Sequence, residues 1–172
     1  FALALHPDGG LLVTDPGRAR VHFFDWSRRR YHALGSERPE GLPSPVGVCT
    51  LDDGRILVSD SRLGCVLGYD RNGQSLGEWV KSGVLGRPAG IVANMQSGEV
   101  YVADVTGHQV AVFDQVGHLL RKLGKRGGGL GEFNFPTHLA LTAGGNLIVT
   151  DSMNFRLQEV RPDGTGVRAI GM

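Results

Sequence analysis

The amino-acid sequence predicts an all-β fold: a β-propeller of four-stranded antiparallel blades, with four blades in this chain. Three observations support this prediction. A unit of about 45 residues occurs four times, short apolar stretches alternate with turn signals inside each unit, and no segment keeps the spacing of 3.6 that an amphipathic helix needs. A repeated unit of this length with four antiparallel strands is typical of a propeller blade.

Composition narrows the class of protein further. The 172 residues carry 18 Lys and Arg against 17 Asp and Glu, a net charge of +1, which argues against a strongly basic nucleic-acid-binding arm or an acidic tail. Apolar residues make up 41% of the chain, enough for a core. No apolar run approaches the roughly 20 residues of a membrane helix. Two cysteines make neither a disulfide scaffold nor a zinc cluster.

The repeat is defined by four aspartates, each at the end of a β-branched stretch. They are spaced 45, 44 and 47 residues apart: Asp15, Asp60, Asp104 and Asp151. A proline precedes three of them by 15 or 16 residues, at Pro45, Pro88 and Pro136, whereas the first repeat begins at Phe1 without one. The repeats predict blades over residues 1–35, 45–80, 88–124 and 136–171.

Repeat two shows how each strand is assigned. Apolar or alternating stretches predict four strands: Val46–Leu51, Arg55–Ser59, Cys65–Tyr69 and Leu76–Val80. The first and last pairs are separated by Asp52-Asp53-Gly54 and Arg71-Asn72-Gly73, and Asp-Gly and Asn-Gly supply the positive φ of tight hairpins. The other repeats follow the same order.

These repeats resemble the NHL-repeat family of β-propellers along the entire chain. Repeat three carries Pro88-Ala89-Gly90-Ile91-Val92-Ala93, Val100-Tyr101-Val102-Ala103-Asp104, Val110-Ala111-Val112-Phe113-Asp114 and Gly124. Repeat four carries Pro136, Asp151, Asn154, Arg156 and Gly171. The chain departs from the family pattern where Cys65 and Gln109 replace its arginine. The glycine-rich segment 127–136 looks most like bacterial members. The resemblance implies a propeller, and a propeller hosts many unrelated functions.

Four blades are fewer than the roughly five or six with which propellers of this family usually close. We therefore expect the chain to be a fragment of a larger propeller, with a four-bladed ring or assembly in trans as the alternatives. An open end exposes a blade face, so we expect self-association through open blade edges. The compartment stays undetermined: bacterial proteins of this kind are often exported, and a signal peptide would lie before Phe1.

The four repeat aspartates are interpreted as structural rather than catalytic residues. Each follows a strand and precedes a loop, where a carboxylate can accept hydrogen bonds from loop N–H groups. Arg20 and Arg156 are placed to pair with Asp15 and Asp151. A residue that recurs once in every blade is expected to stabilise each blade rather than to act in a single catalytic site.

One position suggests a ligand in a propeller channel. His138 stands where the other repeats have Ala2, Gly47 and Gly90, on an inner strand. A metal needs about three or four convergent ligands, so the prediction is no metal and no cofactor. A metal-dependent lyase or hydrolase with a channel site stays an alternative. The sequence contains no motif of a nucleophile, a metalloprotease or a phosphate loop, so the chain is predicted to be non-catalytic, without ruling out an enzyme.

Surface charge suggests where a partner binds. In an up-and-down blade, the loops after the repeat aspartates and the inter-blade linkers share one face, which we call the linker side. Cations outnumber acids there, and the candidate partner-binding residues are Arg18, Arg62, Arg87, Lys125 and Arg126. We expect a scaffold that binds a protein or acidic peptide, with RNA binding as an alternative.

Overall fold

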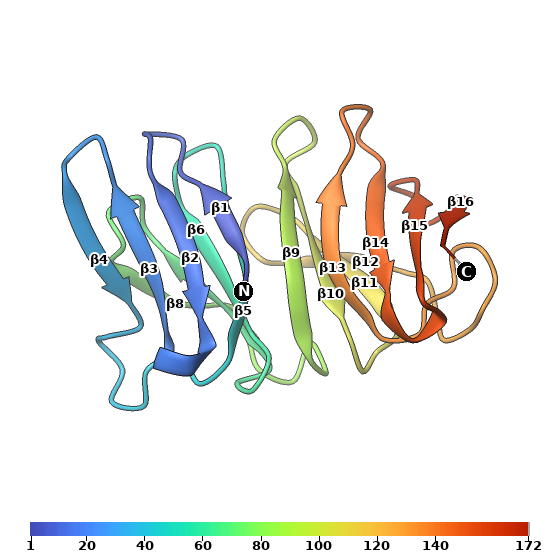
Figure 1. The fold of residues 1–172 in the computed structure, drawn as a ribbon, viewed down its shortest axis with the longest axis horizontal. Helices are drawn as coiled ribbons and strands as arrows, with labels where there is room; N and C mark the ends of the chain where they lie inside the picture. The colour runs from blue at the N-terminus through green and yellow to red at the C-terminus, as the bar shows by residue number, and fades with distance from the viewer. Residues whose placement is uncertain (172) are drawn as a thin grey trace. The chain divides into compact units, whose positions relative to one another are not determined.

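The computed structural model describes residues 1–171, which form sixteen β-strands and two short 3-10 turns. The strands make four sheets, each of four antiparallel strands in chain order (Figure 1). The predicted all-β class with four four-stranded antiparallel sheets is confirmed. Residues 1–171 contain no helix of the length and hydropathy needed to cross a membrane. The chain divides into two compact units, Phe1–Val84 and a second unit that begins at Leu85.

The first unit contains two sheets, which we call blades 1 and 2. Blade 1 consists of β1 (Leu3–Leu5), β2 (Leu11–Asp15), β3 (Arg20–Asp25) and β4 (Arg30–Leu34), with a 3-10 turn at Pro16–Arg18. Blade 2 consists of β5 (Pro45–Thr50), β6 (Ile56–Asp60), β7 (Cys65–Tyr69) and β8 (Ser75–Val80).

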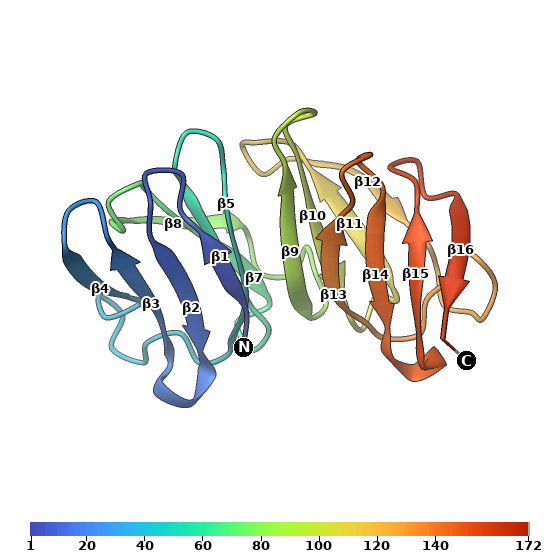
Figure 2. The ribbon, with the colours of Figure 1, turned by 45° about the horizontal axis from the view of Figure 1, so that its top comes forward.

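The second unit contains blades 3 and 4. Blade 3 consists of β9 (Pro88–Asn94), β10 (Glu99–Asp104), β11 (Gln109–Phe113) and β12 (Leu119–Leu123). Blade 4 consists of β13 (Pro136–Leu141), β14 (Leu147–Asp151), β15 (Arg156–Val160) and β16 (Gly166–Ile170), with a 3-10 turn at Ser152–Asn154. Figure 2 shows the four strands of blade 4 side by side in this order.

Pairing of proline with aspartate explains the spacing of the repeat. Pro45 pairs with Asp60, and Pro88 and Pro136 pair in the same way with Asp104 and Asp151. Each proline opens an inner strand, where a residue without an N–H is tolerated. The strand register shifts directly after these pairs. The 15 or 16 residues between proline and aspartate are therefore one inner hairpin.

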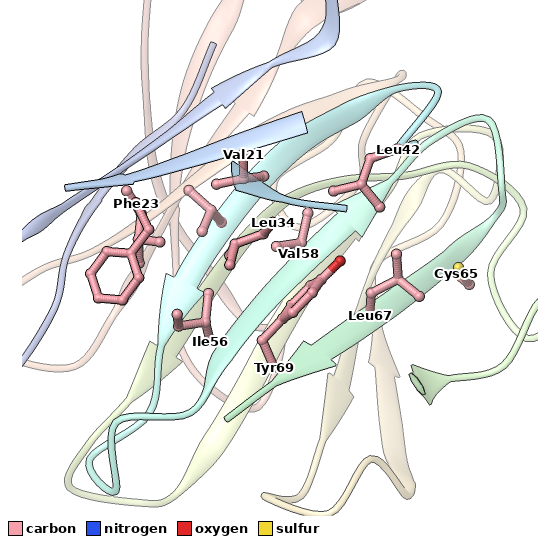
Figure 3. Close-up of a cluster of buried hydrophobic side chains, with 11 residues drawn as sticks. Val21, Phe23, Leu34, Leu42, Ile56, Val58, Cys65, Leu67 and Tyr69 are labelled. Carbon is pink, nitrogen blue, oxygen red and sulfur yellow. The ribbon is translucent and has the colours of Figure 1, made fainter. Parts of the chain in front are cut away.

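The first unit is held together by side chains from the facing sides of blades 1 and 2. Blade 1 contributes Phe23 and Val21, and blade 2 contributes Ile56, Val58 and Tyr69 (Figure 3). Leu42 of the linker between the blades completes this core and is fully buried. Because each strand alternates its side chains between the two faces, the opposite faces of the sheets carry a separate set of residues.

The second unit repeats this arrangement. Tyr101, Val110 and Val112 of blade 3 lie in one buried cluster with Leu147 and Val149 of blade 4. The linker again contributes one large apolar side chain, the fully buried Phe133. Each unit is therefore a pair of blades with a linker residue as part of its core.

Candidate functional site

Asp60 joins two parts of the chain that are distant in sequence. Its carboxylate accepts hydrogen bonds from the backbone N–H groups of Arg62 and Leu63 in the following turn, both at 3.0 Å. It also accepts one from the N–H of Ser44, in the linker that precedes the blade, at 2.9 Å. Asp60 itself is fully buried. One carboxylate thus fastens the linker and the turn to each other.

Asp104 makes the same connection in blade 3. It accepts from the N–H groups of Gly86 and Arg87 in the preceding segment, at 3.1 and 3.0 Å, and from that of Gly107 in the following turn at 3.3 Å. The side chain of Gln109, at the position of the family arginine, donates to it at 3.1 Å. The side-chain amide of Gln109 thus donates a hydrogen bond to Asp104, as an arginine would at this position, but it carries no positive charge.

Asp151 has side-chain donors as well as a linker donor. The N–H of Asn134 donates to it at 2.6 Å, and the guanidinium of Arg156 at 2.9 Å. The amides of Asn154 and Gln158 complete the set at 2.8 and 3.0 Å. Asp151 has zero exposure, and both oxygens of its carboxylate accept hydrogen bonds from this buried polar network.

Asp15 differs in its partners, and one expectation is wrong here. Arg18 donates to it from its backbone N–H at 3.0 Å and from its guanidinium at 3.1 Å, and His22 is 3.1 Å away. The hydrogen bond from His22, followed by those from Arg18, lowers the pKa of Asp15. Arg20 does not pair with Asp15, because Arg18 and His22 occupy the carboxylate, and instead donates to the carbonyl of Arg18.

His138 lies on β13 with an exposed side chain. Its Nδ1 is 3.1 Å from the hydroxyl of Thr137. No group of three or more His, Cys, Asp or Glu side chains within residues 1–171 is arranged to hold a metal ion. A single imidazole provides one ligand of the three or four that a protein metal site uses.

The five candidate partner-binding cations are all exposed, but only two are paired. Arg18 contacts Asp15, and the ammonium of Lys125 lies 3.3 Å from the carboxylate of Glu132. Within the part of the chain that the structure describes, Arg62, Arg87 and Arg126 have no carboxylate within ion-pair distance. The backbone N–H groups of Arg62 and Arg87 donate to the repeat aspartates of their blades. Arg62 and Arg87 are therefore exposed residues with anchored backbone N–H groups.

A hollow of about 340 Å³ lies on the linker side of blade 1. The guanidinium-bearing side chains of Arg18, Arg20 and Arg38 line it together with Pro39 and Glu40. Arg38 donates to Glu40 at 3.1 Å. The three cations outnumber this acid, so the hollow suits an anionic group.

A family model and a relative of known sequence both relate these repeats to the NHL repeat. The model of the NHL repeat matches residues 85–113. Human NHL-repeat-containing protein 4 is 29% identical over 107 residues, which cover 62% of this chain and 84% of that protein. Residues 85–113 are thus an NHL repeat, and the chain is similar to the NHL-repeat β-propellers. The resemblance found in the sequence is thereby confirmed.

Solved structures show that the NHL repeats adopt the blades of a propeller. Virginiamycin B lyase from Staphylococcus aureus superimposes on all of this chain with a TM-score of 0.74 at 12% identity. A gluconolactonase from Xanthomonas campestris superimposes on 99% of it with a TM-score of 0.77 at 18% identity. The chain spans 55% of the lyase and 61% of the gluconolactonase. At this identity the likeness describes the fold alone.

Sequence reasoning missed three apolar side chains on the linker side of the NHL blades. Leu130, Met153 and Phe155 are 54%, 54% and 75% exposed. The N–H of Met153 donates to the carbonyl of Asn134 at 3.0 Å, so the turn that carries Met153 lies against the linker that carries Leu130. The signal was present in the sequence: this turn reads Met-Asn-Phe, where a solvated turn would have polar residues.

The two cysteines lie inside the NHL blades. Cys49 is 7% exposed and Cys65, which replaces the family arginine, is fully buried. Burial raises the pKa of the Cys49 thiol to about 12 and that of Cys65 to about 11. The thiolate is the nucleophile, so neither cysteine is activated at neutral pH.

We expect both thiols to be inert in the folded protein. At pH 8, a disulfide reagent that reports free thiols should give no fast reaction with the native chain and should titrate both cysteines after unfolding in urea, because folding both buries the sulfur and suppresses the thiolate. The variant Ser82→Cys, at an exposed position, is the control and should react at once. Rapid reaction of Cys65 in the native chain would contradict this assignment.

Proposed function

We propose that this NHL-repeat propeller domain binds an acidic segment of a partner protein through its linker side. One observation carries the proposal. The repeat aspartates on this side are consumed by hydrogen bonds to linkers and turns, whereas Arg62, Arg87 and Arg126 are exposed without an ion pair among the described residues. Because these carboxylates are engaged in hydrogen bonds within the fold, they do not pair with the exposed arginines. The arginines are therefore available to an acidic partner.

The hollow of blade 1 supports an acidic side chain as the group recognised. Its volume of about 340 Å³ is at the lower end of the roughly 300–1,000 Å³ of small-molecule sites. Arginine binds a carboxylate through two parallel hydrogen bonds, which gives direction as well as charge attraction. A glutamate or aspartate of the partner could therefore be held by Arg18, Arg20 or Arg38.

Exposed apolar side chains favour protein over RNA as the partner. Leu130 and Met153 lie on the same side of the second unit as Lys125 and Arg126. Met and Arg are enriched in protein interfaces, whereas sequence-specific RNA binding relies on several aromatic platforms. RNA binding stays an outcome of the test below. A channel enzyme would need ligands beside His138 that this proposal does not invoke.

A charge-reversal experiment tests the proposal. The probe is a fluorescein-labelled 12-residue peptide rich in Glu, Asp and Leu, and its binding is measured by fluorescence anisotropy. The double variant Arg87→Glu/Arg126→Glu should weaken binding about tenfold or more, since two favourable charge interactions become repulsive. The control Arg29→Glu/Arg30→Glu changes the net charge equally at the tip of the β3–β4 hairpin and should alter affinity by less than about twofold.

Two results would overturn the proposal. Equal losses for both double variants would mean that net charge alone attracts the peptide. Tighter binding of a labelled single-stranded RNA, with affinity falling steeply as salt rises and lost in Arg87→Glu/Arg126→Glu, would assign the linker side to RNA.

A further inference from the structure

The linker between blades 3 and 4 binds a carboxylate of its own. The side chain of Glu132 accepts a hydrogen bond from the N–H of Gly129 at 2.9 Å, and its other oxygen lies 3.3 Å from the ammonium of Lys125. The hydrogen bond from Gly129, followed by the contacts with Lys125 and with the N–H of Gly128, lowers the pKa of Glu132. Consecutive N–H groups that point to one anion form a binding concavity. We call the N–H groups of Gly128 and Gly129 together with the Lys125 ammonium the carboxylate cradle.

Glycine at position 127 makes room for the bound carboxylate. A Cβ added at Gly127 would overlap the carboxylate of Glu132, and a Cβ added at Gly129 would lie 3.1 Å from one of its oxygens. Neither glycine has the positive φ that would by itself favour this residue. The absence of a side chain at position 127 therefore allows an anion to reach the cradle, and a turn of the backbone does not require it.

The cradle is held in shape by contacts that do not use the Glu132 side chain. It belongs to the linker between two consecutive blades of one unit, and blade 4 binds the carbonyls of this linker. Asn154 donates to the carbonyl of Gly127 at 2.9 Å, and Arg156 donates to that of Gly129 at 2.7 Å. The N–H groups of the cradle therefore keep their direction when the carboxylate of Glu132 moves out.

The carboxylate of Glu132 is only weakly held in the cradle. The side chains of Lys125 and Glu132 are 77% and 30% exposed, and ion pairs as solvated as this one contribute little to stability. The adjoining Arg126 is exposed and has no carboxylate within ion-pair distance among the described residues. A carboxylate that enters from solvent therefore meets the donors that Glu132 uses and a further cation in the next residue.

We propose that the acidic partner inserts a carboxylate into this cradle, and that Glu132 is an internal competitor which closes the cradle in the free protein. This inference rests on the proposed function and adds a site at which one acidic side chain is recognised, together with its regulation. The partner's carboxylate gains the donors that Glu132 gives up. The competition therefore lowers the apparent affinity by the fraction of molecules in which the cradle is open.

Removing the competitor tests the proposal with the whole chain. In the anisotropy assay with the fluorescein-labelled acidic peptide, Glu132→Ala should tighten binding about fivefold or more, because the cradle is then open in every molecule. The matched control Asp52→Ala removes the same charge at the exposed tip of the β5–β6 hairpin and should change the affinity by less than about twofold. Equal tightening in the two variants would mean that only net charge matters, and would overturn the proposal.

Two glycine variants locate the effect in the cradle. Gly127→Ala, added to Glu132→Ala, should abolish the tightening, because its Cβ takes the place of the carboxylate. Gly128→Ala, added to Glu132→Ala, should preserve it, because a Cβ at this position meets nothing within 4 Å and the N–H of the cradle remains. The same affinity in both double variants would contradict a carboxylate bound beside Gly127.

A titration with N-acetylglutamate, followed by amide NMR, distinguishes failure of this inference from failure of the proposed function. In Glu132→Ala, the N–H resonances of Gly128 and Gly129 should shift at millimolar concentrations, and the wild type should need about fivefold more ligand. If the peptide does not bind the wild type, the proposed function fails, and this titration still decides whether the cradle binds a carboxylate. Glycine resonances that stay unmoved in Glu132→Ala would overturn the cradle, whereas peptide binding that is lost in Arg87→Glu/Arg126→Glu would still support the proposed function.

Discussion

Replacing Asp151 with alanine is expected to lower the free energy of unfolding by about 3–5 kcal/mol. The carboxylate is fully buried and accepts hydrogen bonds from Asn134, Asn154, Arg156 and Gln158. The side chain of Arg156 is only 15% exposed. The substitution therefore leaves a largely desolvated charge without its carboxylate and takes one acceptor from each of the other three donors. It also removes the hydrogen bond from the N–H of Asn134, so the linker keeps only the bond from the N–H of Met153 to the carbonyl of Asn134 at this point.

The measurement is urea denaturation followed by far-UV circular dichroism. Trp26 and Trp79 both lie in the first unit, so tryptophan fluorescence reports on that unit alone and should change less than the dichroism if the two units unfold separately. Asp163→Ala is the matched control: this exposed aspartate accepts local hydrogen bonds from Thr165, one of them from its N–H at 2.8 Å, and their loss should cost less than about 1 kcal/mol. Similar losses in the two variants would mean that the Asp151 network adds nothing to stability.

The repeat could be found in the sequence because its signals are local. Asp-Gly and Asn-Gly pairs fix hairpins without help from the rest of the fold, and the expected strand Cys65–Tyr69 agrees with β7 at both ends. The role of the aspartates was predicted only in part. The sequence indicates that Asp60 bonds to its own turn, whereas its bond to Ser44 depends on which linker the tertiary structure brings beside it.

The candidate site was harder to predict because it depends on competition between side chains. Arg20 and Arg156 occupy the same position in the repeat, yet only Arg156 reaches its aspartate. His22 in blade 1 corresponds to Gln158 in blade 4 and, together with Arg18, takes the acceptor that Arg20 was expected to use. The hollow lined by Arg38 was missed for a related reason, since a list of charges on one side of a blade does not show where its surface is concave.

Replacing Gly90 with alanine is expected to destabilise the second unit by about 2 kcal/mol. The added Cβ would lie 2.8 Å from the Cα of His138, 2.8 Å from the nitrogen of Leu139 and 2.9 Å from the carbonyl oxygen of Thr137. All three atoms belong to the backbone of β13, so no side-chain rotation relieves the contact. β13 has to move away from β9, which loosens the core that contains Tyr101 and Leu147.

Gly128→Ala separates this steric effect from the general cost of replacing glycine. An added Cβ at Gly128 meets nothing within 4 Å, so the variant should be neutral or slightly more stable, because alanine restricts the unfolded chain. In the first unit, Ala2 occupies the position of Gly90 while β1 still packs against β5. A blade pair can therefore accommodate this methyl group when its strands are built for it. Equal stability of Gly90→Ala and Gly128→Ala would contradict this prediction. It would mean that β13 can accommodate a methyl group at position 90 as β5 accommodates that of Ala2. Glycine at position 90 would then not be needed for the packing of the second unit.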